Sequence, residues 1–358
     1  TLENNTGDAV AVKIGAPLQN LTNLAGAGIT NYNLGQLTTH GVKDLSIVVS
    51  NEIANNGTTT TIANIWDRDL VNLTLTATGN VNVGTVTGNT VNSNIKTVNA
   101  SAVGGNTTAT VKALGDSAVV TLAAGNDVFN ALGSAGNNVT IQAGEGNNTI
   151  TGTAQSDYIY SGAGRDVIDA NRGNNTVKSG AGDDTVTALN GSNTVDLGSG
   201  KADAATFNYD TAGQLNLATN VVAGSGTSAA VRFVSGPGVD AVFGTADDVV
   251  AADYGFAVGD GAEASIKFTG ITFAGATQDL DTGCKVILNG ADTTASVNTK
   301  SISKDGGVNT FRSSVVVGRH ADRARCTVSC QSLMLDNISR SDTIPAMDVR
   351  NSTAQVGH

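Results

Sequence analysis

Hydrophobic and polar residues alternate over short stretches of this chain, and turns rich in glycine and asparagine separate them. In NLTLTATGNVNVGTV, residues 72–86, the aliphatic residues recur with a period of two, which predicts β-strands rather than helices. Comparable runs follow one another from residue 43 to residue 120. The pattern therefore predicts an all-β chain of short strands joined by tight turns.

A nine-residue pattern repeats without interruption from residue 157 to residue 193. Most copies place a glycine two residues before an Asp or Asn and an aliphatic residue two residues after it. Glycine permits the positive φ of a tight turn, and the aliphatic side chain can point into a core. Two turns then make one coil, so residues 18 apart lie above one another. The Asp and Asn positions are Asp127, Asn138, Asn148, Asp157, Asp166, Asn175, Asp184 and Asn193, and the aliphatic positions are Ile150, Ile159, Ile168, Val177, Val186 and Val195.

The acids of this repeat predict calcium sites. Calcium takes six or more oxygen ligands, which a glycine-rich turn supplies as backbone carbonyls and an Asp as a carboxylate. We expect Asp166 and Asp184 to form the best pair, because they stand on one side of successive coils. At Asn148, Asn175 and Asn193 a neutral amide weakens ion binding, and an amide ladder of a metal-free solenoid is the alternative. The predicted metal ligands are Asp127, Asp157, Asp166 and Asp184, with Asp240, Asp247 and Asp248 of the acidic segment 238–250 as further candidates.

Charge and composition narrow the classes of function. The net charge is −11, from 20 basic and 31 acidic residues, which excludes a basic surface for nucleic acid. We find no apolar run long enough to span a membrane. No zinc spacing, nucleophile elbow, phosphate-binding loop or dinucleotide fingerprint occurs, so we expect a non-enzymatic protein.

Residues 43–200 resemble bacterial RTX-type surface proteins, including S-layer proteins and β-strand-repeat adhesins. The stretches NSNIKTVNASAVGGNTTATV and GTAQSDYIYSGAGRDVIDANRGNNTVKSGAGDDTV carry this resemblance. It implies a secreted, calcium-binding protein at the bacterial cell surface. The implied partners are further copies of the chain, in a lattice or filament, or glycans of the cell surface.

Residues 262–358 resemble the β-helix core of SufB, a scaffold for iron–sulfur cluster assembly. NTKSISKDGGVNTFRSSVVV and SCQSLMLDNISRSDTIPAMDVRNSTAQVGH carry the resemblance. It implies a cytoplasmic protein in which Cys330 and His358 belong to the cluster-assembly region. The chain departs from the family pattern at Gln331, where the family has an acid, and at Ile344-Pro345-Ala346. We therefore expect this region to serve as a folded wall with reduced, inert cysteines.

These observations predict a right-handed parallel β-solenoid or β-roll in four regions. Residues 1–120 form a β-strand-repeat region, 121–200 the calcium roll, 201–261 a Gly/Asp-rich connection and 262–358 the SufB-like β-helix. The leading hypothesis is a calcium-binding extracellular structural or adhesive protein. The alternatives are a scaffold that carries an iron–sulfur cluster, or a composite chain that joins two genes.

Overall fold

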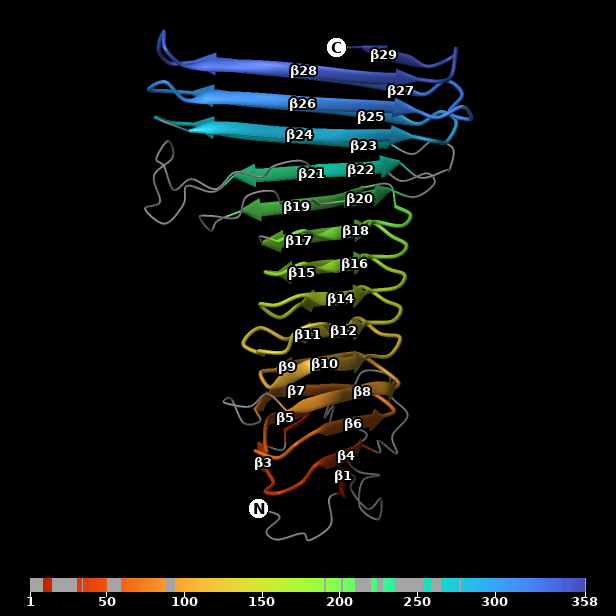
Figure 1. The fold of residues 1–358 in the computed structure, drawn as a ribbon. Coiled ribbons are helices and arrows are strands. Elements are labelled where there is room, and N and C mark those ends of the chain that lie inside the picture. The colour runs from red at the N-terminus through yellow and green to blue at the C-terminus, as the bar shows by residue number, and fades with distance from the viewer. Residues whose placement is uncertain are drawn as a thin grey trace. The chain divides into compact units, whose positions relative to one another are not determined.

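The structure is a computed structural model that describes residues 9–14, 31–33, 35–49, 59–87, 94–189, 191–200, 202–209, 220–223, 228–235, 254–258, 265–276 and 278–357. In these ranges it contains strands β1 to β29 and no helix, and adjacent strands of each sheet pair in parallel (Figure 1). The predicted all-β parallel solenoid is thereby confirmed. None of the described segments is a helix that could cross a membrane. The chain divides into two compact units, Thr1–Ala170 and Asn171–His358, which we describe separately.

The first unit alternates its strands between two parallel sheets, as a solenoid does. Its first sheet runs in the order β1 (Ala9–Ile14), β4 (Asp44–Val49), β6 (Asn72–Ala77), β8 (Ile95–Val103), β10 (Leu114–Thr121), β12 (Val139–Gln142) and β14 (Asp157–Tyr160). Its second sheet runs in the order β2 (Asn31–Asn33), β5 (Thr59–Trp66), β7 (Asn80–Thr87), β9 (Thr107–Val111), β11 (Val128–Asn130), β13 (Thr149–Thr151) and β15 (Val167–Asn171), with β3 (Gln36–Thr38) also paired to β5.

The second unit has the same alternation, and its strands lengthen from three residues in β16 to ten residues in β23 through β28. Its first sheet runs in the order β16 (Thr176–Lys178), β18 (Thr194–Asp196), β20 (Asn220–Ala223), β22 (Tyr254–Val258), β24 (Asp279–Leu288), β26 (Val308–Val317) and β28 (Arg340–Val349). Its second sheet runs in the order β17 (Thr185–Leu189), β19 (Asp203–Tyr209), β21 (Ser228–Ser235), β23 (Ser265–Ala274), β25 (Thr294–Ser303), β27 (Arg325–Met334) and β29 (Gln355–Gly357).

In each unit, the core of the repeat block (residues 121–200) is a ladder of single aliphatic side chains. Strands of three residues, such as β16 and β18, point their middle residue inward and the two flanking residues outward. The aliphatic residues predicted to face inward are all at most 1% exposed: Ile150, Ile159, Ile168, Val177, Val186 and Val195. The sequence therefore identified the core of this block correctly.

Glycine is required where successive turns approach each other closely. Gly164 has φ 134°, and a Cβ atom built on it would lie 2.2 Å from the carbonyl oxygen of Gly146. No side chain fits at that distance, so the turns can stack only if this position is glycine. The predicted positive φ is found at all five repeat glycines: Gly146, Gly164, Gly173, Gly182 and Gly191.

Candidate functional site

Buried Asp and Asn side chains mark the entry to strands of the second sheet in both units. Asp127, Asn148 and Asp166 stand directly before β11, β13 and β15 in the first unit. In the second unit Asp184 stands before β17, and Asp203 is the first residue of β19. All five side chains are at most 1% exposed, so four carboxyl groups and one amide lie inside these turns.

In four of these side chains, Oδ1 accepts a hydrogen bond from the backbone of the preceding coil. Oδ1 of Asp127 accepts the backbone N–H of Thr107 at 2.5 Å, and Oδ1 of Asn148 accepts that of Asp127 at 3.0 Å. Oδ1 of Asp166 accepts the N–H of Asn148 at 2.7 Å. In the second unit Oδ1 of Asp203 accepts the N–H of Asp184 at 2.9 Å. At Oδ1, an Asp and an Asn therefore accept the same kind of hydrogen bond.

An exposed ladder of asparagines runs beside this buried one in the opposite direction. The N–H of Asn126 bonds to Oδ1 of Asn106 at 2.8 Å, and the N–H of Asn147 bonds to Oδ1 of Asn126 at 2.7 Å. In the second unit the N–H of Ser192 bonds to Oδ1 of Asn174 at 2.8 Å. Here each side chain accepts from the coil that follows. This exposed ladder was not predicted, because the amide ladder expected from the sequence involves Asn148, Asn175 and Asn193; of these, Asn193 accepts the Asn175 backbone N–H at 3.1 Å.

The second side-chain atom separates the acids from the amides. Nδ2 of Asn148 donates to the carbonyl oxygens of Gly144, Gly146 and Ser161 at 3.4, 3.0 and 3.2 Å. A carboxylate in the same arrangement presents a second oxygen instead of this donor. Oδ2 of Asp127 and Oδ2 of Asp203 are buried and have no hydrogen-bond partner among the described residues. Such an oxygen requires a proton or a cation.

Burial makes the charge on these carboxyl groups costly. It raises the pKa of Asp127 to about 6, against the hydrogen bond from the Thr107 backbone. Burial also raises the pKa of Asp166 and of Asp203, to which the negative charges of Glu145 and Asp183 respectively add a smaller effect. Near neutral pH a bound cation would offset this cost.

The donor set fits a hard cation that takes oxygen ligands. In the described ranges no group of three His, Cys, Asp or Glu side chains is arranged to hold a metal ion. A cation in these turns would therefore take one carboxylate and several backbone carbonyls of the kind that surround Asn148 Nδ2. Calcium accepts such a mixture at loose geometry, whereas zinc and iron favour histidine or cysteine.

Asp157 lies in a different environment from the other acids. It begins β14 of the first sheet, and its Oδ2 accepts the Thr153 backbone N–H at 2.7 Å. The Thr153 hydroxyl lies 2.9 Å from Oδ1. Burial raises the pKa of Asp157 to about 7. Its own turn thus supplies donors to both carboxylate oxygens, which supports the lower rank we give it as a calcium ligand.

The structure does not test the remaining predicted ligands in the same way. Asp166 belongs to the first unit and Asp184 to the second, so their joint site stays a prediction. Asp240, Asp247, Asp248 and His358 lie outside the described residues. Asp203 was not predicted, although it follows Asn193 by ten residues, the loosened step already seen from Asn138 to Asn148. Extending that step would have found it.

The three cysteines belong to the long strands of the second unit. Cys284 on β24 and Cys326 on β27 are buried, and Cys330 on β27 lines a cavity of about 10 Å³ beside Thr299 and Asn309. That space suits about one water molecule. Burial raises the pKa of the Cys326 thiol to about 11 and that of Cys284 further still. Both thiols are therefore protonated near neutral pH in the absence of metal, and the described ranges hold no group of three His, Cys, Asp or Glu side chains that could bind a metal ion.

Comparison with known proteins gives one family match in the repeat region and another in the C-terminal part. Residues 132–201 carry RTX calcium-binding repeats. The matches cover residues 132–168, 142–177 and 169–201 with the RTX calcium-binding nonapeptide repeat. Residues 238–358 match the SufBD core domain of the SUF system for FeS cluster assembly. The two resemblances expected from the sequence are therefore confirmed.

The curated relatives match only the C-terminal part. An iron-sulfur cluster assembly SufBD family protein of Staphylococcus saprophyticus is 43% identical over 101 residues, which is 28% of this chain and 21% of that protein. SufBD family proteins of Mycobacterium leprae and Mycobacterium bovis are 36% and 35% identical over 98 residues, or 27% of this chain and 11% and 12% of theirs. The chain thus spans about a fifth of these relatives or less.

Proposed function

We propose that the chain is a calcium-dependent structural protein without enzymatic activity. Calcium ions order the turns of the repeat block, and the C-terminal β-helix continues the solenoid as a wall. The observation that carries this proposal is the buried Oδ2 of Asp127, which has no hydrogen-bond partner in the part of the chain that the structure describes. The RTX match at residues 132–201 supports the same cation.

Asp127, Asp166, Asp184 and Asp203 would hold the ions together with turn carbonyls. A bound Ca²⁺ supplies positive charge that neutralises the buried carboxylate and links carbonyl oxygens that otherwise repel one another. Oδ1 of the acid keeps its bond to the neighbouring coil, as at Asp166. The asparagine coils need no ion, because Nδ2 of Asn148 already donates to the carbonyls.

A reciprocal exchange of acid and amide tests this account. Asp166→Asn should lower the number of bound calcium ions, and it should raise the melting temperature in chelator because the amide carries no charge in this buried position. Asn148→Asp should do the reverse and create a new dependence on calcium. Equilibrium dialysis and circular dichroism melting with calcium and with chelator measure both effects. Identical melting curves of the parent protein in the two buffers would eliminate a structural calcium site.

Asp157→Asn is the matched control, because Thr153 already donates to that carboxylate. It should change calcium binding less than Asp166→Asn does. A greater loss of calcium from Asp157→Asn would show that the proposed coil register of the ligands is wrong.

We further propose that the protein is exported and acts at the bacterial surface, by self-assembly into a lattice or filament or by adhesion to glycans. The RTX repeats support this role, whereas the SufBD match supports a cytoplasmic alternative. Fractionation of the source cells distinguishes them. The intact mass of the native protein tests the third hypothesis, a composite chain.

The second candidate function is an iron–sulfur cluster scaffold, favoured by the 43% identity of the C-terminal part to a SufBD family protein. Cys330 is its one cysteine that is only partly buried. We expect anaerobic reconstitution with iron and sulfide to give no stoichiometric cluster absorption. A cluster that forms in the parent protein and is lost in Cys330→Ser would establish this second function instead.

A further inference from the structure

An open groove of about 480 Å³ lies on the long-strand part of the second unit. Two columns of residues from successive coils line it. Thr294, Arg325 and Gln355 are in register at the starts of β25, β27 and β29. Asp292, Arg323 and Thr353 precede them by two residues each and complete the lining. The volume is within the usual range of small-molecule sites.

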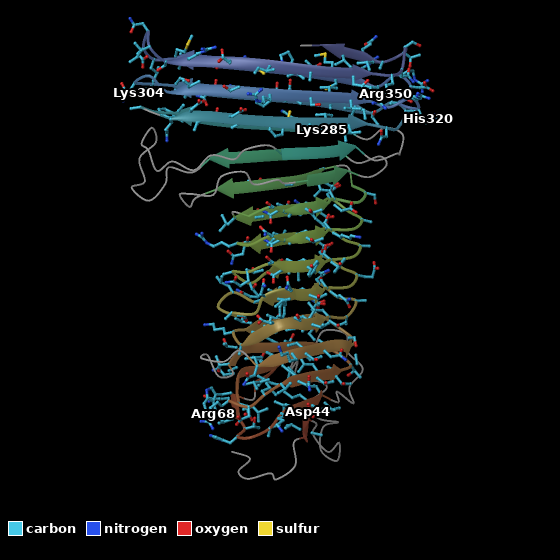
Figure 2. All side chains as sticks on the ribbon, viewed as in Figure 1. Asp44, Arg68, Lys285, Lys304, His320 and Arg350 are labelled. Atoms are coloured by element: carbon cyan, nitrogen blue, oxygen red, sulfur yellow. The ribbon has the colours of Figure 1, made fainter. Side chains whose placement is uncertain are left out.

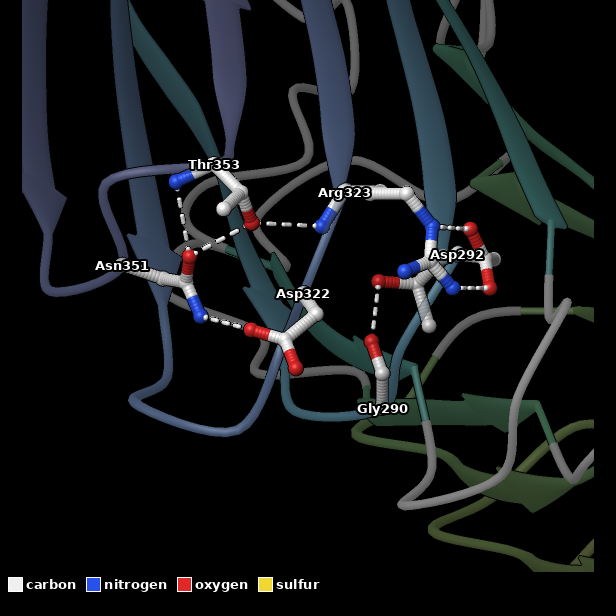
Figure 3. Close-up of polar contacts among 7 residues, drawn as sticks. Gly290, Asp292, Asp322, Arg323, Asn351 and Thr353 are labelled. Carbon is white, nitrogen blue, oxygen red and sulfur yellow. Dashed lines mark hydrogen bonds and ion pairs between the residues drawn. The ribbon is translucent and has the colours of Figure 1, made fainter.

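The two arginines of this groove differ in whether they have a bonding partner. Arg323 donates from Nε to Oδ1 of Asp292 and from Nη2 to Oδ2 of the same carboxylate, as Figure 3 shows. Arg325 lies near enough to Asp292 to lower the pKa of that carboxyl. Its guanidinium makes no hydrogen bond or ion pair with any residue of the described ranges. Among the lining residues, two arginines and one aspartate therefore leave one positive charge over in a chain whose net charge is −11, and Asp322 outside the lining also acts on Arg323.

The turns that carry the groove are held in place by further hydrogen bonds. The backbone N–H of Arg323 donates to Oγ1 of Thr353 at 2.8 Å, and that hydroxyl lies 2.7 Å from Oδ1 of Asn351. Nδ2 of Asn351 donates to Asp322 at 2.7 Å. Figure 3 shows the Asp322 carboxylate directed at Asn351, and Asp322 does not line the groove.

A histidine and a further arginine lie at the same end of the long strands. Figure 2 shows His320 and Arg350 at this end, while Lys304 lies at the opposite one. Arg350 is already paired with Asp348. Arg325 is thus the guanidinium in the groove's lining that remains available.

We propose that this groove binds a small molecule through an oxyanion, either a carboxylate or a phosphate. The planar guanidinium of Arg325 presents two parallel N–H donors that match two oxygens of such a group. Thr294 and Gln355, its neighbours in register, add a hydroxyl and an amide donor. Asp292 limits the affinity, because it occupies Arg323 and adds a negative charge. The site is separate from the calcium turns and does not depend on them.

The test follows the arginine Nε–H signals of the ¹⁵N-labelled full chain during titration. The probes are methyl phosphate and succinate, which were chosen because they bind calcium only weakly. Chloride at the same ionic strength is the control. We expect a saturable shift of the Arg325 signal with an oxyanion and none with chloride. The tighter of the two probes identifies the head group as phosphate or carboxylate.

Three variants decide whether the groove is the site. Arg325→Gln should weaken binding at least tenfold without changing the melting temperature, because the side chain is exposed. Arg340→Gln removes an exposed arginine that pairs with Asp342 outside the groove, and it should change binding less than twofold. Asp292→Asn should strengthen binding severalfold, since it frees Arg323, and Asn tolerates the left-handed backbone of φ 57° found there.

Several outcomes would overturn the proposal. Non-saturable shifts, or equal losses from Arg325→Gln and Arg340→Gln, would indicate general attraction of anions to surface charge. Unchanged or weaker binding in Asp292→Asn would show that Asp292 does not compete for the site.

Discussion

The repeat block and the C-terminal β-helix solve the same problem of stacking parallel coils with different means. In the repeat block, residues 18 apart stack, and a side-chain oxygen such as Oδ1 of Asp166 binds the backbone of the coil before. In the C-terminal part, residues 29 to 32 apart stack, and exposed ion pairs such as Arg312–Asp281 join the coils. The short coil relies on its turns, whereas the long coil relies on its strands.

The amount of side chain buried by each strand explains this difference. β16 buries one residue, Val177, whereas β26 buries Asn309, Phe311, Ser313, Val315 and Val317. A buried valine contributes about 1.5–3 kcal/mol, and ordering each residue of backbone costs roughly 1–2 kcal/mol. A coil with two such strands therefore needs further stabilisation at its turns, which the ladders and the proposed calcium ions provide.

The largest expected effect comes from closing the space between the turns of the repeat block. Gly164→Ala places a Cβ atom 2.2 Å from the Gly146 carbonyl oxygen at φ 134°. We expect a loss of about 3 kcal/mol or more in the free energy of unfolding. Gly306→Ala is the matched control in the β-helix, because its φ is 87° but its nearest atoms are 3.5 Å away on the Ile338 side chain. It should cost only about 1–2 kcal/mol. Equal losses in urea unfolding would contradict the comparison.

A smaller effect is expected from pH in the absence of calcium. Burial raises the pKa of Asp157 to about 7 from an ordinary value of 3.8, so between these values the folded form binds the proton that the unfolded form has released. Stability should therefore fall as pH rises from 5 to 8, by roughly 2 kcal/mol. Carboxyl groups with lowered pKa, such as Asp336 at about 2, lose their contribution only at more acidic pH.

Urea unfolding in chelator at pH 5 and pH 8 measures this dependence. Asp157→Asn should flatten it, because the amide does not titrate. A parent protein that becomes more stable between pH 5 and pH 8 would contradict the proposed cost of the buried charge.

The smallest effects are expected from removing single interactions that join neighbouring coils. Asn126→Ala removes the acceptor of the Asn147 N–H and should cost about 0.5–1 kcal/mol. Arg312→Gln breaks an ion pair whose side chains are both 51% exposed and should cost less than about 0.5 kcal/mol. Thermal unfolding of the two variants ranks them, and the reverse order would remove the distinction between the two kinds of coil.

Sequence reasoning identified what repeats along the chain. The nine-residue step located the inward aliphatic residues and the positive-φ glycines, because one residue in each copy has one geometric role. It ranked Asp157 below Asp166 as a calcium ligand, but it could not find the donors from Thr153, because they arise from a local turn rather than from the repeat. The groove around Arg325 was equally invisible, because its residues lie about 30 positions apart and no motif links them.

Hydrogen exchange measured by mass spectrometry with calcium and with chelator tests the central claim most directly, because it resolves the two regions in one experiment. We predict that calcium slows exchange in peptides from residues 121–209, whose turns hold the buried acids from Asp127 to Asp203, and leaves peptides from residues 278–357 unchanged. Equal exchange in the two buffers throughout the chain, or protection confined to the C-terminal part, would contradict the account.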